Sequence, residues 1–246
     1  MRTRISLIGI GTGNPDHLTL EAVKAINEAA LILIPRKSVE KGDLVDLRRR
    51  LCADVLTNPG TKLVEFDLPV RDAGNPDYRA GVDEWHDEIA TCWQEILNLE
   101  LPGGGEAALL VWGDPSLYDS TLRIAARLEV TVRVIPGITA IQGLTAAHAM
   151  VLNEIGEPFL VTTGRQLRAQ GWPAGVDTLV VMLDAGCAFE TLAPEGVSIW
   201  WGAYLGMDRQ MIHAGALAEA GPAITKARAT ARAAHGWVMD IYILRR

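Results

Sequence analysis

Hydrophobic positions in the first part of the chain alternate between short unbroken runs and longer stretches with helical spacing. The short runs are typical of buried strands, and they predict strands over 4–10, 31–34, 107–112 and 130–135. Apolar residues recur every three or four positions in the intervening stretches, which predicts helices over 18–30, 44–56, 77–99 and 118–128. Strands that alternate with helices in this way indicate an α/β fold with a mostly parallel sheet.

The pattern starts again after the segment 153–158. Further apolar runs follow, and they predict buried strands over 159–162, 178–183, 197–201 and 237–244. We therefore predict two α/β domains, an N-terminal one over 1–153 and a C-terminal one over 154–246. The longest stretch without a charged residue, 134–153, is interrupted by proline and glycine, so it indicates a buried turn and helix and not a membrane span.

Composition and charge narrow the class of protein. Among 246 residues, 23 Lys and Arg stand against 30 Asp and Glu, which gives a net charge of −7. This balance argues against a general binder of nucleic acid or of an anionic membrane, because both require a basic surface. The three cysteines, Cys52, Cys92 and Cys187, have no C-x-x-C spacing, so neither a disulfide framework nor a zinc site is expected. We expect a soluble cytoplasmic protein that holds no metal.

Glycine-rich turns follow three of the predicted strands. The first, Gly9-Ile-Gly11-Thr-Gly13, lacks the G-x-G-x-x-G spacing of a dinucleotide loop because Asn14 occupies the sixth position. It also lacks the lysine of a phosphate-binding loop. Taken by itself, this segment is equally consistent with a tight turn from a strand into a helix.

The second and third turns are Gly113-Asp114-Pro115 and the segment 136–140, each placed directly after a predicted strand. Ligands of open α/β sheets bind beyond the carboxyl ends of the strands, so we expect these two turns to line one pocket. Gly113 would let a ligand approach the backbone closely. Asp114 could instead cap the following helix, with Pro115 in its first turn.

These motifs, in this order, resemble the tetrapyrrole methylase family. The family pattern G-x-G-P-G-[DE]-P-x-x-L-T is similar to residues 9–19, and its G-D-P motif is matched by 113–115. Its P-G-[IV]-[TS]-[AS] motif is matched by 136–140, and a later T-L-V-x-x-M strand looks like 178–183. The resemblance covers nearly the whole chain.

Within the family, the resemblance is closest to the branch that methylates C1 of a precorrin with loss of an acetyl group. The segments that carry this match are 181–189, 201–206 and 235–246. In the first turn the chain departs from the family, with Thr12 in place of a proline and Asn14 in place of an acid. For that reason we carry no cofactor contact over to the first turn.

The resemblance implies two α/β domains with S-adenosylmethionine in the cleft between them, commonly in a homodimer. The implied reaction is C1 methylation of precorrin-5 to precorrin-6A, with the acetyl group released as acetate. One alternative is a methylase of the same family that acts at another ring carbon. Another is a non-catalytic partner that binds a precorrin or a nucleotide.

By position, the family's cofactor contacts fall on ten residues of this chain. They are Trp112, Gly113, Asp114, Leu117, Thr139, Ala140, Met182, Leu183, Tyr204 and Leu205. Read from the residues alone, Met182 and Leu183 would be ordinary core side chains. The cofactor carries its own activated methyl group, so no covalent protein intermediate is expected.

A precorrin bears many carboxylates, so a protein of net negative charge needs a locally basic site to bind it. The candidates for substrate binding are Arg36, Lys37 and Arg165, with Lys41, Arg48 and Arg168 beside them in the sequence. Each of them could instead belong to a solvated basic face.

Release of acetate needs a base or a hydrogen-bond donor, unless the substrate itself drives the loss. The chemically able residues are His17, His148, His213, Asp16 and Asp184, and spacing does not choose among them. His148 is equally explained as a core histidine. No catalytic residue is therefore assigned from the sequence.

Overall fold

The computed structural model describes residues 2–36, 42–72, 74 and 77–246. Contacts divide the chain into two compact units, one of 1–11 with 15–138 and one of 12–14 with 139–246. Helix α5 (Ala140–Ala147) belongs to the second unit by its contacts. As a boundary between separately folding domains, the division between 153 and 154 stays a prediction.

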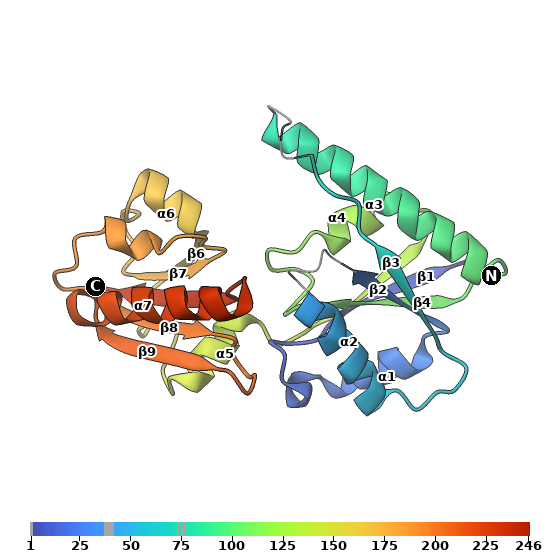
Figure 1. Cartoon of the computed structure of the whole chain (residues 1–246), viewed down its shortest axis with the longest axis horizontal. Helices are drawn as coiled ribbons and strands as arrows, with labels where there is room; N and C mark the ends of the chain where they lie inside the picture. The colour runs from blue at the N-terminus through green and yellow to red at the C-terminus, as the bar shows by residue number, and fades with distance from the viewer. Residues whose placement is uncertain (1, 37–41, 73, 75–76) are drawn as a thin grey trace. The chain divides into compact units, whose positions relative to one another are not determined.

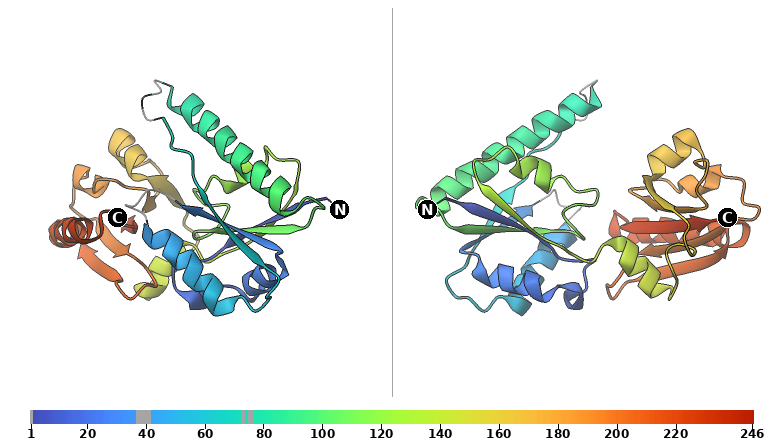
Figure 2. Two further views of the ribbon diagram at one scale, coloured as in Figure 1. Left: turned by 45° about the vertical axis from the view of Figure 1, so that its right-hand side comes forward. Right: turned by 180° about the vertical axis from the view of Figure 1, so that it is seen from behind.

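The first unit is a five-stranded sheet with helices on both faces (Figure 1, Figure 2). Its order is β3-β2-β4-β1-β5 and every neighbouring pair is parallel, so the predicted parallel sheet is confirmed here. The strands are β1 (Arg4–Gly9), β2 (Leu31–Arg36), β3 (Lys62–Asp67), β4 (Glu106–Val111) and β5 (Thr131–Ile135). The helices are α1 (Leu20–Glu28), α2 (Gly42–Val55), α3 (Tyr78–Glu100) and α4 (Thr121–Ala125), with a 3-10 turn η1 (Pro15–His17).

Alternate residues of the strands supply two separate cores. Ile5 and Leu7 of β1 pack in the cluster that includes α3 and α4, whereas Ile8 packs in the cluster of α1 and α2. Side chains alternate between the two faces of a strand, so a strand covered on both faces is apolar throughout. This explains the unbroken hydrophobic run that predicted β1.

Helix starts in this unit follow from local side-chain chemistry. The Thr19 hydroxyl accepts a hydrogen bond from the Ala22 amide at 3.0 Å and caps α1. The Asp77 carboxylate accepts hydrogen bonds from the Arg79 and Ala80 amides and caps α3. The predicted starts of these two helices are therefore confirmed.

The predicted end of β2 at Pro35 is wrong, because the strand continues to Arg36. Beyond Leu33, β2 pairs with β3 alone, and the Arg36 carbonyl accepts a hydrogen bond from the Leu68 amide on that side. Successive residues of a strand point their backbone groups to opposite sides. Pro35 therefore faces the side where β2 has no registered partner, and its missing N–H breaks no ladder bond.

Two further elements differ from the sequence prediction. Strand β3 was missed because it lies at the edge of the sheet, where Leu63 is exposed and charged residues flank the apolar ones. The helix predicted over 118–128 is only α4 (Thr121–Ala125), because Tyr118 has a left-handed backbone with φ 50°. Pro115 therefore does not lie in the first turn of a helix.

The second unit also contains a five-stranded sheet, of order β6-β7-β10-β8-β9. Only β6 and β7 are parallel, and the pairs β7–β10, β10–β8 and β8–β9 are antiparallel, so this sheet is mixed, unlike the parallel sheet of the first unit. A short connection from β8 to β9 makes a hairpin, which requires antiparallel strands. The strands are β6 (Phe159–Thr163), β7 (Thr178–Met182), β8 (Ser198–Ala203), β9 (Met211–Ala216) and β10 (Asp240–Arg245).

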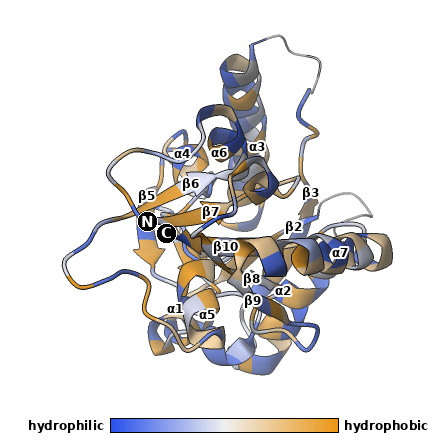
Figure 3. Ribbon diagram, turned by 90° about the vertical axis from the view of Figure 1, so that its left-hand side faces the viewer, coloured by the Kyte–Doolittle hydropathy of each residue, from blue (hydrophilic) through white to orange (hydrophobic). Residues whose placement is uncertain are grey.

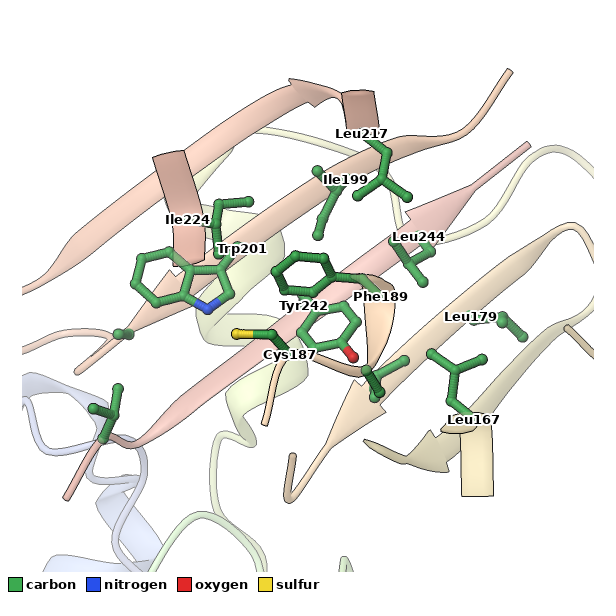
Figure 4. Close-up of a cluster of buried hydrophobic side chains, with 14 of the residues drawn as sticks. Leu167, Leu179, Cys187, Phe189, Ile199, Trp201, Leu217, Ile224, Tyr242 and Leu244 are labelled. Carbon is green, nitrogen blue, oxygen red and sulfur yellow. The ribbon is translucent and has the colours of Figure 1, made fainter. Parts of the chain in front are cut away.

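The helices of this unit cover both faces of its sheet. Helices α6 (Gly164–Gln170) and α7 (Leu217–His235) and the 3-10 turn η3 (Ala188–Thr191) pack on the face that carries Trp201 and Tyr242 (Figure 4). Gly202 lies on the opposite face, where a Cβ would meet Leu144 of α5 at 2.8 Å. In Figure 3 strands β7 and β10 are mainly hydrophobic in colour, as expected of strands covered on both faces.

The described residues contain neither a candidate membrane span nor a candidate metal cluster. No helix there combines the length and the apolar character that a membrane crossing requires. In the same part of the chain, no group of three His, Cys, Asp or Glu side chains is arranged to hold a metal ion.

Candidate functional site

Three glycines bring the carboxyl ends of β1, β4 and β5 into contact. Strand β1 lies between β4 and β5 in the sheet, so the loops after β4 and β5 meet over its end. A Cβ on Gly9 would lie 2.6 Å from the Gly137 amide nitrogen, and a Cβ on Gly137 would overlap the Gly113 carbonyl oxygen. No side chain fits at either position. We call Gly9, Gly113 and Gly137 the glycine junction.

Gly113 is the member of the junction that leaves open space. Its φ of +65° is left-handed, and it exchanges backbone hydrogen bonds with Gly11 at 2.8 and 3.3 Å. Although the residue is buried, no heavy atom lies within 4 Å of the position that its Cβ would take. This space would fit a ligand that approaches the backbone directly, and a side chain at this position would fill it.

Asp114 holds the loop after β4 against the loop after β5. Its Oδ2 accepts a hydrogen bond from the Gly137 amide at 2.9 Å, and its Oδ1 accepts bonds from the Ser116 amide and hydroxyl. Burial acts to raise the pKa of Asp114, but these hydrogen bonds outweigh it, so the pKa lies below its usual value. The second and third turns therefore meet as predicted, and the Asp114 carboxylate fixes their geometry.

The neighbouring predicted contacts are half-buried. Trp112 packs against the core of α1 and α2, and Leu117 lies in the loop after the junction. Thr139 caps α5, because its hydroxyl accepts a hydrogen bond from the Ile141 amide at 3.1 Å. The same hydroxyl donates a hydrogen bond to the side-chain oxygen of Gln142. Ala140 is the first residue of that helix, so these two residues would offer a ligand mainly backbone and methyl groups.

The other four predicted contacts of the second unit lie at or just after the ends of β7 and β8, and the first of them, Met182, is half-buried at the end of β7. Leu183 is 63% exposed and has a left-handed backbone, with φ 52°. Tyr204 is also left-handed but buried, and its hydroxyl donates to the Trp237 carbonyl at 2.6 Å. Leu205 is buried near Gly143 and Gly202. Of the residues after β7 and β8, Leu183 offers an exposed side chain, while Tyr204 and Leu205 would offer backbone.

The structure argues against Asp184 as a base for deacetylation. Its carboxylate accepts four hydrogen bonds, two to each oxygen, from Arg168, Gly186, Ala188 and Tyr242. Burial acts to raise the pKa of Asp184, but the bonds from the amides, Tyr242 and Arg168 outweigh it and lower the pKa. A carboxylate with occupied oxygens and a low pKa cannot readily take up a proton.

The three histidine candidates make contacts that fit structural roles. The Nε2 of His148 lies 3.0 Å from the Trp201 carbonyl oxygen, which can only accept, so this nitrogen carries the hydrogen. His213 packs against the Trp201 ring, with the centroids 5.8 Å apart. His17 packs beneath Gly11, whose Cβ would lie 2.6 Å from the histidine Cβ. Asp16 lies in the same short turn, η1.

Several basic residues predicted to bind substrate carboxylates already have partners. Arg36 donates to both oxygens of Asp67, at 2.9 and 3.0 Å. Arg48 donates to the Leu110 carbonyl at 2.9 Å, and although burial lowers its pKa to about 10 it remains protonated at neutral pH. Arg168 is paired with Asp184, whereas Arg165 is exposed on α6. Lys37 and Lys41 lie outside the described residues.

Comparison with known proteins identifies the family. The profile of the Tetrapyrrole (Corrin/Porphyrin) Methylases matches residues 4–221. The chain belongs to the tetrapyrrole methylase family. A methylase named precorrin-6A synthase [deacetylating], from Sinorhizobium sp., is 43% identical over 249 residues, which are 99% of this chain and 95% of that protein.

Solved structures of methylases share the fold of this chain. A cobalamin synthesis related protein (CobF) from Corynebacterium diphtheriae has a TM-score of 0.83 and 38% identity, and the match covers 99% of this chain and 98% of that one. A uroporphyrin-III C-methyl transferase from Thermus thermophilus, complexed with S-adenyl homocysteine, has a TM-score of 0.59 and 19% identity, and covers 99% and 97%. At this identity the second match bears on the fold alone.

The sequence located the turns after β4 and β5, but it did not show which residues of the two turns contact one another. Gly9 and Gly137 contact one another because β1 lies beside β5 in the sheet. The order of strands in a sheet cannot be predicted from short stretches of sequence. Arg228 and Asp240, which form a buried pair at 2.9 Å in the second unit, were also missed. One signal was available for Asp240, an acid directly before the apolar run of β10.

Proposed function

We propose that this methylase transfers the methyl group of S-adenosylmethionine to C1 of precorrin-5 and that water then cleaves off the acetyl group as acetate, giving precorrin-6A. The similarity to the deacetylating synthase of Sinorhizobium supports this reaction, because it extends over 99% of this chain. The observation that carries the proposal in the structure is the open space at Gly113, at the end of a central parallel strand.

We propose cofactor contacts in each unit, at the positions that the family resemblance implies. In the first unit they are Trp112, Gly113, Asp114 and Leu117; in the second they are Thr139, Ala140, Met182, Leu183, Tyr204 and Leu205. The free backbone approach at Gly113 and the exposed side chain of Leu183 support this choice. For Asp114 and Tyr204, whose polar side-chain atoms have partners within the protein, the proposed contacts are made by the backbone.

S-adenosylmethionine, when bound, supplies a methyl group activated on a sulfonium. The protein then has to hold the ring carbon in line with that methyl group, and positioning of this kind can be worth an effective molarity of ~10⁵ M or more. The glycine junction and the hydrogen bond from Gly137 to Asp114 support such positioning, because they hold the backbone after β4 in one conformation. No side chain is needed as a nucleophile.

The polyacid substrate requires cations near the site. We propose Arg36, Lys37 and Arg165 as its partners, and the two of these that the structure describes, Arg36 and Arg165, are both exposed. We further propose that the enzyme works in the cytoplasm, without nucleic acid or membrane, as its cysteines and its net charge suggest, and as a homodimer, as the resemblance implies.

The Gly113→Arg substitution tests the proposed cofactor site. We expect loss of S-adenosylhomocysteine binding by at least ~100-fold in calorimetry, because the side chain fills the space at Gly113, while circular dichroism stays native. Gly175→Arg is a matched control, since Gly175 also has a left-handed φ, of +75°, and no heavy atom within 4 Å of its Cβ position. Retained binding in Gly113→Arg would refute this placement of the cofactor.

The reaction itself is tested by incubation with precorrin-5 and labelled S-adenosylmethionine, followed by mass spectrometry. A product with one more methyl group and one fewer acetyl group supports the proposal. Methylation without loss of the acetyl group would instead favour a methylase that acts at another ring carbon. Substrate binding without turnover would favour a non-catalytic partner.

A further inference from the structure

The loop that follows β7 in the second unit is anchored by one buried carboxylate. Asp184 has a side chain only 3% exposed, and its oxygens accept hydrogen bonds from Gly186 and Ala188 of the same loop at 3.0 and 2.5 Å. Two side chains from other elements complete the set, Arg168 of α6 at 3.0 Å and Tyr242 of β10 at 2.7 Å. The carboxylate therefore ties the loop to a helix and to the sheet at once.

The main chain of the same loop is held by a second buried side chain, that of Arg228. Arg228 of α7 donates to the carbonyl oxygens of Asp184 and Ala185, at 2.7 and 3.3 Å. Its Nε donates to Asp240 at 2.9 Å, and the same Asp240 oxygen accepts a bond from the Trp201 indole at 2.9 Å. Both charges of the Arg228–Asp240 pair are buried, so the guanidinium has a fixed position beneath the loop.

Gly164 shows how closely the fold is built around this carboxylate. It begins α6, directly after β6, and a Cβ there would overlap the carboxyl carbon and Oδ1 of Asp184. A glycine is therefore required for space alone. Because the two residues are so close, the Asp184 side chain has no room to change rotamer toward Gly164.

Leu183 is the residue that these interactions set in place. It stands between Met182, the last residue of β7, and the anchored Asp184. Its left-handed backbone is unfavourable for a residue with a side chain, so the surrounding structure must impose it. The result is an exposed leucine directed away from a buried strand and a buried aspartate.

We propose that Asp184 is a positioning residue for the methyl donor, because its carboxylate holds Met182 and Leu183 in the conformation that contacts the cofactor. This inference rests on the proposed function, in which Met182 and Leu183 are cofactor contacts. Asp184 itself touches neither cofactor nor substrate in this scheme. Its effect is on cofactor affinity and not on the chemical step.

Asp184→Asn is the direct test, since an amide keeps the size of the side chain but replaces one accepting oxygen by a donor. We expect the Kd for S-adenosylhomocysteine and the KM for S-adenosylmethionine to rise about 10-fold, with kcat at saturating cofactor within about 3-fold of the wild type. Tyr242→Phe removes only one of the four bonds, so we expect a smaller rise of the same kind. This milder variant keeps the test available if Asp184→Asn does not fold.

Ile224→Val is the matched control for general loss of stability. Ile224 is fully buried in the same core, and it makes none of the hydrogen bonds to the loop (Figure 4). We expect this variant to lower the Tm without changing the Kd. An equal rise in Kd for Ile224→Val and Asp184→Asn would overturn the inference, as would native binding in Asp184→Asn. A wild-type protein that does not bind S-adenosylhomocysteine would refute the proposed function itself.

Discussion

The two units stabilise irregular backbone at the ends of their strands in opposite ways. In the first unit the loops after β1, β4 and β5 pack backbone against backbone, because Gly9 and Gly137 have no side chains to separate them, and the Asp114 carboxylate adds one bond from the Gly137 amide. In the second unit the loop after β7 is held by buried side chains, chiefly Asp184 and Arg228. Close backbone contact tolerates no added atom, whereas a buried network of charges tolerates no missing partner.

The largest effect is expected where the charged network loses one partner. Arg228→Met should lower the free energy of unfolding by about 3–5 kcal/mol, because it leaves the Asp240 carboxylate buried without a cation. Urea unfolding at pH 7 measures this loss.

The double variant Arg228→Met with Asp240→Asn should recover a substantial part of the lost stability. It removes the unpaired charge and keeps an oxygen that can accept the Trp201 indole bond. Arg49→Met is the control, since its ion pairs with Asp46 and Glu65 are exposed, and it should leave the urea midpoint nearly unchanged. If Arg228→Met and Arg49→Met lost equal amounts of unfolding free energy, the buried charges of the second unit would be no more important to stability than exposed ones.

The next effect concerns the glycine junction. Gly137→Ala should destabilise the protein by about 1–3 kcal/mol and weaken cofactor binding, because its Cβ overlaps the Gly113 carbonyl oxygen. Gly103→Ala is the matched control, since no heavy atom lies within 4 Å of its Cβ position. Calorimetric melting of the two variants makes the comparison. A Gly137→Ala protein as stable as Gly103→Ala would mean that the three loops are not tightly joined.

The smallest effect is a dependence on acid in the first unit. Because the folded-state pKa of Asp114 lies below its ordinary value of 3.8, its carboxylate contributes stability that is complete above pH 3.8 and is lost as the pH falls through the folded-state pKa. Asp114→Asn should therefore be less stable than the wild type at pH 7 and should lose less stability on acidification below pH 3.8. Urea midpoints at pH 7, 5 and 3.5 test this. If the urea midpoints of the two proteins fell equally with pH, Asp114 would make no contribution to acid stability.

The parts of the fold that could be predicted are those whose signal is local. Helix α3 carries its apolar stripe and its Asp77 cap within one stretch of sequence, and β4 is an unbroken apolar run. Strand β9 was missed because its sequence contains alanine and glycine and only one β-branched residue, Ile212. The position of β10 between β7 and β8, antiparallel to both, could not be predicted either, because these pairs join strands that are distant in the sequence.

The candidate site divides in the same way. Gly113 and Asp114 could be found because a glycine and an acid directly follow a predicted strand. The bond from Gly137 to Asp114 could not, since it depends on both flanking strands lying beside β1. The ion pair between Arg36 and Asp67 could not be predicted either, because Asp67 is the last residue of β3, a strand that the hydrophobic pattern did not indicate.

Leu183 and Tyr204 have a consequence for attempts to make this protein more heat-resistant. Glycine adopts their left-handed backbone without strain, so a search for stabilising substitutions guided by backbone geometry alone would select it at both positions. Leu183→Gly would remove an exposed side chain that we propose as a cofactor contact, so a gain in melting temperature should come with weaker binding of S-adenosylhomocysteine. Both positions should be left unchanged in any such library.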